Sequence, residues 1–174
     1  MLIPDTYRRP LAWSILAIWL VLSGLAIWFS FHEPYRDFLQ GKEPSFNSDI
    51  ALTGIDSLTV VHFSDENCPC TRFSLSHVSD LEREFNKARH IRVSPSDLAS
   101  LTWSRVSKLA VSSPSVAIIN AAGKLAYYGP YTDGVLCSQG RDLVSQVIEN
   151  LGADESFQWM NVLGYGCFCD WPSV

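Results

Sequence analysis

The sequence predicts an α/β protein with a mixed β-sheet flanked by helices, preceded by one transmembrane helix. Two observations predict this class: a 21-residue stretch without charge near the N-terminus, and an alternation of strand-like and helix-like segments after residue 57. A third observation, two Cys-x-Cys pairs, points to the chemistry. Together they divide the chain into an N-terminus (1–10), a transmembrane segment (11–31), a linker (32–56), a folded domain (57–156) and a C-terminal tail (157–174).

The uncharged stretch from Leu11 to Phe31 is predicted to be an uncleaved signal anchor. As a helix, its 21 residues reach about 31 Å, roughly the thickness of a bilayer core. Trp13 and Trp28 lie near its ends, where interfacial aromatic residues are typical, and Arg8 and Arg9 precede it. By the positive-inside rule the N-terminus is cytoplasmic. The domain then lies outside the cell (inner) membrane, in the periplasm of a Gram-negative host.

Two other interpretations of this stretch are a cleaved signal peptide and a buried helix of a soluble protein. The apolar run is too long for a typical signal-peptide core. The sequence Trp28-Phe29-Ser30-Phe31-His32 also offers no small-residue cleavage site. An anchor in the bilayer is therefore favoured.

Charge limits the partners of the domain. The chain has 18 acidic and 13 basic residues. Without Asp5, Arg8 and Arg9, 17 acidic and 11 basic residues remain, which gives the domain a net charge of −6. A nucleic acid or an anionic lipid surface would repel such a domain. No nucleic acid is expected among its partners.

The segments after the linker follow two hydrophobic patterns. The nearly continuous apolar run 58–63 predicts a strand buried on both faces, and apolar residues at helical spacing over 71–88 predict an amphipathic helix. Strands are further predicted over 90–93, 115–119 and 124–128, the last two joined by the turn 120–123, and helices over 97–110 and 143–151. The order β-α-β-α-β-β-α describes a parallel crossover followed by a hairpin in one mixed sheet.

Five cysteines, four of them in pairs separated by one residue, indicate thiol chemistry. Cys68-Pro69-Cys70 lies between the first predicted strand and helix, where unsatisfied N–H groups and the helix dipole lower the pKa of a thiol. Cys167-Phe168-Cys169 lies near the C-terminus, and Cys137 lies between the pairs, before the last helix. Cys68 and Cys70 could bond to each other in a turned backbone. The alternatives are structural bonds to other cysteines and metal ligation.

From residue 57 to 151 the chain resembles the thioredoxin-like superfamily. Residues 60–70 (VVHFSDENCPC) are similar to its strand and redox turn, Ser113-Pro114 before 115–119 to its cis-proline loop, and 123–129 to its last turn and strand. The resemblance implies Cys68 and Cys70 as redox residues, facing Pro114. The chain is also similar to an uncharacterised membrane-anchored subfamily with Cys-Pro-Cys and Cys-Phe-Cys pairs, which implies no established activity.

The chain departs from the family pattern at four places. Its redox motif lacks one intervening residue, and His62 stands where many members have a buried carboxylate. Residues 130–137 are inserted before the last helix, and the tail 157–174 has no counterpart in the minimal fold. Burial should keep His62 neutral, either as a proton relay or as a hydrogen-bonded core residue. His77 is expected to be a surface or packing residue, and Asp65 a solvated turn residue.

Three functions agree with these features. The first is an anchored thiol–disulfide oxidoreductase acting on exported proteins that bear thiols or disulfides, with Cys68 or Cys70 as nucleophile and no cofactor. The second is a metal-binding domain for copper or zinc, with Cys68, Cys70, Cys167 and Cys169 as ligands. The third is a redox-inactive interaction domain.

The tail is expected to dock on the domain, because a free tail would not need Phe157, Trp159, Phe168 and Trp171. Docking near the first pair would allow Cys167 or Cys169 to exchange with Cys68 or Cys70. The alternative is an independent structural clasp, bonded to Cys137.

Overall fold

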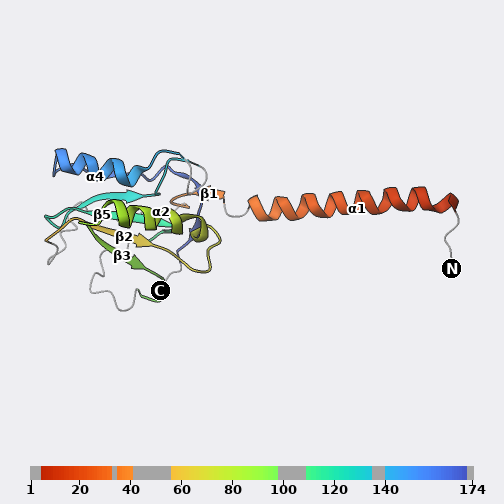
Figure 1. The fold of residues 1–174 in the computed structure, drawn as a ribbon, viewed down its shortest axis with the longest axis horizontal. Coiled ribbons are helices and arrows are strands. Elements are labelled where there is room, and N and C mark those ends of the chain that lie inside the picture. Colours follow the sequence, from red (N-terminus) through yellow and green to blue (C-terminus); the bar gives the residue numbers. More distant parts are fainter. Residues whose placement is uncertain (1–4, 33–34, 41–55, 98–108, 135–139, 172–174) are drawn as a thin grey trace. The chain divides into compact units, whose positions relative to one another are not determined.

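The structure, a computed structural model, describes residues 5–32, 35–40, 56–97, 109–134 and 140–171. It divides into two units, Met1–Glu33 and Pro34–Val174. The first unit contains helix α1 (Asp5–His32; Figure 1). Within α1, the 21 residues Arg9–Phe29 have a mean hydropathy of 2.1, long and apolar enough to cross a membrane. A single N-terminal apolar helix is therefore present, consistent with a signal anchor or a signal peptide.

The second unit is built on a five-stranded mixed sheet in the order β3-β2-β5-β6-β7. Its strands are β2 (Thr59–Phe63), β3 (Arg89–Val93), β5 (Ser115–Ile119), β6 (Leu125–Gly129) and β7 (Trp159–Met160). Strand β2 is parallel to β3 and antiparallel to β5, and β6 is antiparallel to β5. The predicted parallel crossover, hairpin and mixed α/β sheet are confirmed.

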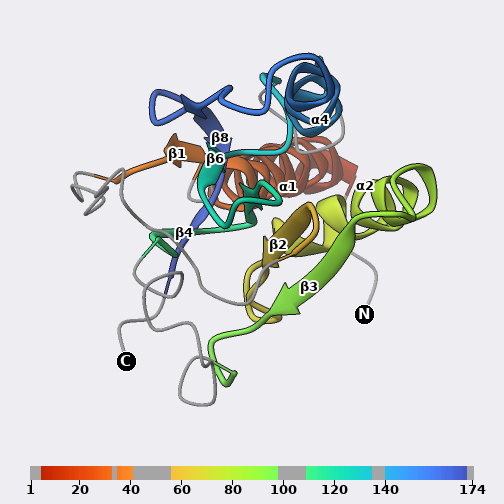
Figure 2. The same ribbon diagram turned by 90° about the vertical axis from the view of Figure 1, so that its left-hand side faces the viewer.

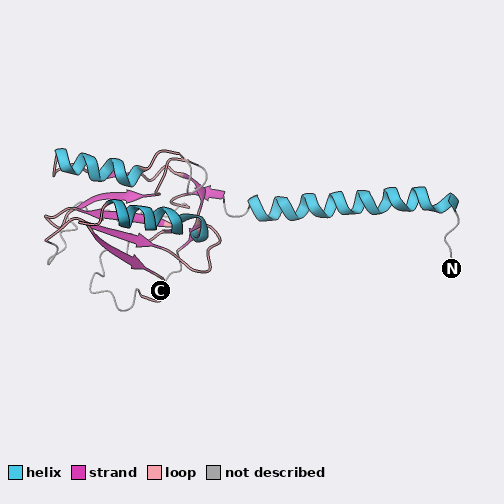
Figure 3. Ribbon diagram, viewed as in Figure 1, coloured by secondary structure: helices cyan, strands magenta, loops and turns pink. Residues whose placement is uncertain are grey.

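Two helices, α2 (Thr71–Glu84) and α4 (Leu143–Ala153), pack on one face of this sheet (Figures 2 and 3). Apolar residues at helical spacing explain the packing: Val78 and Leu81 of α2 and Val144 and Val147 of α4 share one core cluster with inward residues of the strands. Helix α4 begins at Asp142, whose carboxylate accepts from the backbone N–H groups of residues 144 and 145. The predicted helix over 143–151 is thus confirmed.

The opposite face of the sheet is covered by chain segments rather than by described helices. They form two short antiparallel ladders, β1–β8 and β4–β9, from β1 (Tyr35–Asp37), β4 (Ser112–Ser113), β8 (Tyr165–Cys167) and β9 (Cys169–Asp170). Phe38, Phe168 and Trp171 lie in the core cluster on this face, together with Phe63 and Tyr128 of the sheet. The tail therefore completes the second hydrophobic core.

Several elements differ from the expectation: the end of α2, and the short strands β1, β4, β7, β8 and β9, which were not predicted. Helix α2 ends at Glu84 rather than near residue 88, because Phe85 leaves helical geometry (φ −103°, ψ 47°). Strand β1 lies within the segment expected to be irregular; three residues are too few to give a periodic signal. The helix expected over 97–110 falls largely on 98–108, outside the described residues.

Candidate functional site

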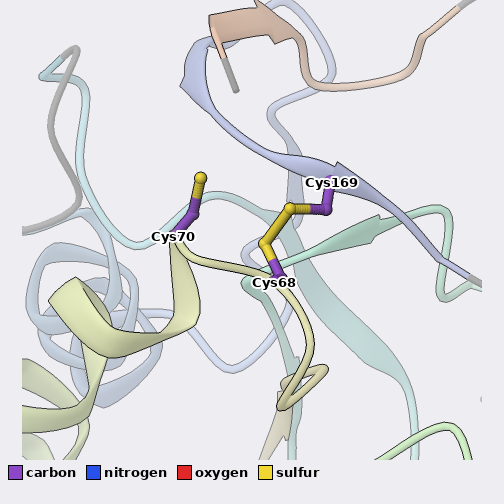
Figure 4. A group of neighbouring side chains, drawn as sticks. All are labelled: Cys68, Cys70 and Cys169. Carbon is purple, nitrogen blue, oxygen red and sulfur yellow. A yellow bond between two sulfur atoms is a disulfide. The ribbon is translucent and has the colours of Figure 1, made fainter. Parts of the chain in front are cut away.

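Two disulfides join the two Cys-x-Cys pairs. Cys68 is bonded to Cys169 and Cys70 to Cys167, with Cα atoms 5.9 and 5.5 Å apart. Figure 4 shows the first of these bonds and the sulfur of Cys70 beside it. We call these four residues the cysteine clasp. Of the alternatives open from sequence, Cys68 and Cys70 bond to other cysteines rather than to each other. The expected docking of the tail on the domain is confirmed, and it brings the tail cysteines to the first pair.

The first pair is positioned by the turn that leads from β2 into α2. The carboxylate of Asp65 accepts hydrogen bonds from the backbone N–H of Asn67 (2.9 Å) and from its side chain (3.2 Å). The carbonyl of Asp65 accepts from the Thr71 hydroxyl (2.7 Å) and from the N–H of Cys68 (3.1 Å). The expectation of a solvated Asp65 is therefore wrong: the residue is 8% exposed and organises the turn.

Cys70 occupies the N-cap position of α2. Its side chain makes no capping hydrogen bond, so its sulfur is free to bond to Cys167. The exposed N–H groups and the dipole of the helix start favour a thiolate there when the disulfide is reduced. The predicted location of the pair, at the junction of a strand and a helix, is confirmed.

The loop before β5 borders the clasp. The peptide bond between Ser113 and Pro114 is cis, as expected. The carbonyl oxygen of Ser113 lies 3.4 Å from Sγ of Cys68. The hydroxyl of Ser113 accepts a hydrogen bond from the backbone N–H of Asp65 (2.8 Å). Ser113 therefore ties the cis-proline loop to the turn that carries the first pair.

The tail is held by more than its disulfides. Cys169 lies opposite Ser113 in the β4–β9 ladder, and Cys167 lies opposite Tyr35 in the β1–β8 ladder. Phe168 packs edge-on against Phe38, with ring centroids 5.2 Å apart. Trp171 packs edge-on against Phe63 at 5.8 Å, and both tail aromatic residues are 4% exposed. The ion pair between Arg36 and Asp170 (3.2 Å) adds a contact at the surface.

The two disulfides differ in access. Cys70 is fully buried and Cys167 is 4% exposed, whereas Cys169 is partly exposed. Cys68 is 3% exposed but lines a cavity of about 650 Å³. The cavity also contains polar and charged side chains, among them Ser64, Asn67, Arg72 and Arg92. A small thiol or a peptide side chain can therefore approach the Cys68–Cys169 bond more readily than the other.

His62 lies at the centre of a buried hydrogen-bonded chain. The carbonyl of Phe85 can only accept, so Nε2 of His90 donates to it (3.1 Å). In a neutral His90 the Nδ1 atom then accepts from Nε2 of His62 (3.0 Å), and Nδ1 of His62 accepts from the Tyr131 hydroxyl (2.9 Å). The chain thus has one direction, from Tyr131 to Phe85.

The environment of His62 keeps it uncharged. Desolvation, followed by the nearby His90, lowers the pKa of His62 to about 3. The expected burial and neutrality are confirmed. His77 packs its ring edge-on against Tyr131 (centroids 5.8 Å apart), with Nε2 3.6 Å from the carboxylate of Asp142, so it is a packing residue.

The clasp is also the place where a metal could bind. The sulfur atoms of Cys68, Cys70 and Cys169 lie within 4.8 Å of one another, a set made only of cysteines. Bonded as disulfides they have no lone thiolate to offer, so ligation requires reduction.

Several site residues are absent from the sequence-based prediction. Tyr131 and His90 meet the predicted residues only in the folded chain, and no motif marks them. Ser113 belongs to the predicted cis-proline loop, but its contacts with Cys68 and Asp65 were not predicted. Tyr131 lies in the segment predicted only as an insertion. The interpretation of Cys137 falls outside the described residues. Both tail cysteines are bonded to the first pair. The alternative of an independent tail with a disulfide to Cys137 is therefore wrong.

A search of the curated proteins finds no match. Among solved structures, the chain is similar to an uncharacterized conserved protein from Geobacillus kaustophilus, with 15% identity and a TM-score of 0.45 over 68% of this chain and 80% of that one. A hypothetical protein from Sinorhizobium meliloti 1021 gives 11% identity and a TM-score of 0.46 over 67% and 80%. Residues 37–171, more than half of the chain, match the family model described as a domain of unknown function, DUF6436. The chain therefore belongs to the DUF6436 family.

Proposed function

We propose that the protein is a membrane-anchored, extracytoplasmic thiol–disulfide oxidoreductase that oxidises thiols of exported proteins through the Cys68–Cys169 disulfide. One observation carries the proposal: this bond joins a cysteine of the turn before α2, which lines a cavity, to a partly exposed tail cysteine, beside the cis-proline loop. A purely structural bridge needs no such access.

The first step is attack by a substrate thiolate on Sγ of Cys169, the partly exposed member of the bond. A substrate–Cys169 disulfide forms, the Cys68–Cys169 bond breaks, and Cys68 leaves as a thiolate. A leaving thiol with a lowered pKa departs faster, and the start of α2 lowers the pKa of a thiol close to it. Cys68, two residues before the N-cap of α2, is thus the better leaving group.

In the second step another substrate thiol attacks the mixed disulfide. The substrate then holds a new disulfide, and Cys169 is released as a thiolate that takes up a proton. Two substrate thiols have lost two electrons and two protons, and the Cys68–Cys169 disulfide has gained them. The products are one substrate disulfide and two protein thiols.

The buried Cys70–Cys167 disulfide serves as a second store of oxidising equivalents. The sulfur atoms of Cys68 and Cys70 lie within 4.8 Å of each other, so the Cys68 thiolate is close enough to attack Cys70. That exchange forms Cys68–Cys70 and releases the Cys167 thiolate, with no net oxidation or reduction. The remaining disulfide thereby moves next to the cavity.

The test measures how the disulfides of the full-length protein in detergent react with excess reduced glutathione, followed by acid quenching and mass spectrometry. We expect a fast phase linear in glutathione, unaffected by sub-denaturing urea, with Cys169 as the first modified residue. Replacing Cys68 and Cys169 by Ser should remove the fast phase, while Cys137→Ser should leave it unchanged. Reduction of both disulfides together, at the rate of unfolding, would instead identify a structural clasp and refute the proposal.

The anchoring part of the proposal is supported by α1. Arg8 and Arg9 lie near the N-terminal end of this apolar helix, and by the positive-inside rule they favour an orientation with that end in the cytoplasm. In that orientation the cysteine domain would lie in an oxidising compartment. A reporter enzyme that works only outside the cytoplasm, fused after Val174, should be active, and the full-length protein should remain in the membrane after alkaline extraction. Activity of a cytoplasm-only reporter at that position would overturn the orientation.

A further inference from the structure

We infer that the fully reduced protein binds Cu(I) through thiolates of both cysteine pairs. The inference concerns the reduced clasp and stands independently of the proposed exchange reaction. Full reduction transfers four electrons and four protons to the two disulfides, and any thiol reductant, such as reduced glutathione, supplies them by forming two disulfides of its own. The four resulting thiols then release protons as they bind the ion.

The distances between the sulfur atoms fit a shared ion. A metal–thiolate bond of about 2.3 Å allows two sulfur ligands of one ion to lie up to about 4.6 Å apart. The sulfur atoms of Cys68, Cys70 and Cys169 already lie within 4.8 Å of one another, and that of Cys167 is bonded to Cys70. Side-chain rotation alone can therefore bring thiolates of both segments onto one ion.

The tail stays in place when its disulfides are reduced, because other contacts hold it. The N–H of Phe38 donates to the carbonyl of Gly164 (2.7 Å), and the N–H of Trp171 donates to the carbonyl of Val111 (3.2 Å). Two β-ladders flank Phe168, whose buried ring fills the core between them. The reduced clasp is thus a preformed set of four thiols rather than two separate pairs.

The donor set favours a soft ion. The candidate ligands that gather within the described residues are all cysteines, with no carboxylate or imidazole in the group. Soft thiolates favour Cu(I) and zinc among biological metals. Zinc sites typically separate paired cysteines by two or more residues, whereas both pairs here are separated by one. We therefore assign the site to Cu(I) in preference to Zn(II).

Three of the four cysteines are buried, whereas one stays accessible. Cys68, Cys70 and Cys167 are each less than 5% exposed, and Cys169 is partly exposed. Thiolates close to the start of α2 are stabilised by the helix dipole. The site thus has buried ligands and an open side through which the ion can enter.

The experiment reduces the full-length protein in detergent with a phosphine, removes the reductant without oxygen and titrates Cu(I) against a chromogenic Cu(I) chelator. We expect the protein to compete with the chelator. The double variants C68S/C70S and C167S/C169S should each lose more affinity than the roughly 10–100-fold that the loss of a supporting residue costs. The control C137S should bind as the wild type does. Equal affinity in either double variant and the wild type would overturn the shared site.

A second measurement avoids variants that fail to fold. Wild-type protein loaded with Cu(I) is alkylated and its modified cysteines are mapped. We expect protection in both segments, at Cys68 or Cys70 and at Cys167 or Cys169, while Cys137 reacts as in the metal-free protein. Protection confined to one segment would reduce the site to a simple two-cysteine chelate and refute the inference. Zn(II) that displaces bound Cu(I) at equal concentration would refute the assignment to copper.

Discussion

Cys169 lies directly opposite Ser113, whose bond to Pro114 is cis, and the sulfur of Cys169 is bonded to Cys68 in the turn before α2. Cys169 is thus held in two ways, by strand pairing through its backbone and by a disulfide through its side chain. An extended segment that adds a strand to a sheet edge gains affinity from its backbone and specificity from its side chains. The tail is bound to its own domain as such a segment, with a cysteine as the specific side chain.

Docking of the tail should persist after reduction, because it depends on buried aromatic rings. Replacing Trp171 by Ala should lower the free energy of unfolding of the reduced protein by about 3–5 kcal/mol. Trp171 is 4% exposed and packs against Phe63. Urea unfolding under a phosphine measures the effect. Leu163→Ala is the control, since Leu163 is 92% exposed and its truncation should change stability by less than about 0.5 kcal/mol.

The two disulfides should contribute non-additively to stability. Each closes a loop of about one hundred residues, with sequence separations of 101 and 97, and either alone restricts the unfolded chain almost as much as both. Replacing all four cysteines by Ser should cost roughly 2–5 kcal/mol. The variants C68S/C169S and C70S/C167S should each lose less than half of that. Losses of the two variants that sum to the full loss would contradict this account.

The turn before α2 should depend on the carboxylate oxygen of Asp65. Asp65→Ala removes the acceptor for two hydrogen bonds from Asn67 and should cost about 1–3 kcal/mol in stability. Asp65→Asn keeps one acceptor oxygen and should cost less. The exposed neighbour Glu66, replaced by Ala, is the matched control and should be near neutral. A loss in Asp65→Asn equal to that in Asp65→Ala would show that the hydrogen bonds are not the cause.

The sheet and its two described helices could be predicted from sequence because their signals are local. An apolar run such as 59–63 and the helical spacing of Val78 and Leu81 report burial on a sheet face or a helix face. The turn over 120–123 is predictable for the same reason, because glycine marks positions that need a positive φ. Gly123 indeed has a φ of 74°. Such patterns need no knowledge of distant segments.

The partners in the site could not be predicted, because they meet only in the folded chain. Five cysteines allow 15 ways of forming two bridges, and spacing does not choose among them. Strands β4 and β9 have two residues each, too few for a periodic pattern. Tyr131 lies in a loop without a recognisable motif, and only the folded chain brings its hydroxyl to 2.9 Å from Nδ1 of His62. The sequence therefore predicts thiol chemistry but not which thiols are bonded to each other.

His62 should make the domain less stable in acid. Its pKa is about 3 in the folded protein and 6.5 in an unfolded chain, so below 6.5 the unfolded state binds the proton first. The free energy of unfolding contributed by His62 is fully present above about pH 6.5 and is lost as the pH falls toward 3, by at most about 1.4 kcal/mol per pH unit.

His62→Asn removes this titration and should flatten the stability profile in that window. Carboxylates such as Asp142 titrate in both proteins, so the difference between the profiles isolates His62. Desolvation raises the pKa of Asp142, but the nearby His77 and the hydrogen bonds from Ser145 outweigh it and lower that pKa overall. Tyr131→Phe is the control: loss of the donor to Nδ1 should cost about 1–3 kcal/mol at pH 7 and leave the slope unchanged, because burial, the main cause of the shift, remains. Urea unfolding of the full-length protein between pH 3.5 and 7.5 measures all three profiles. Identical slopes for the wild type and His62→Asn would mean that His62 has the same pKa in the folded and the unfolded protein, and would contradict this account.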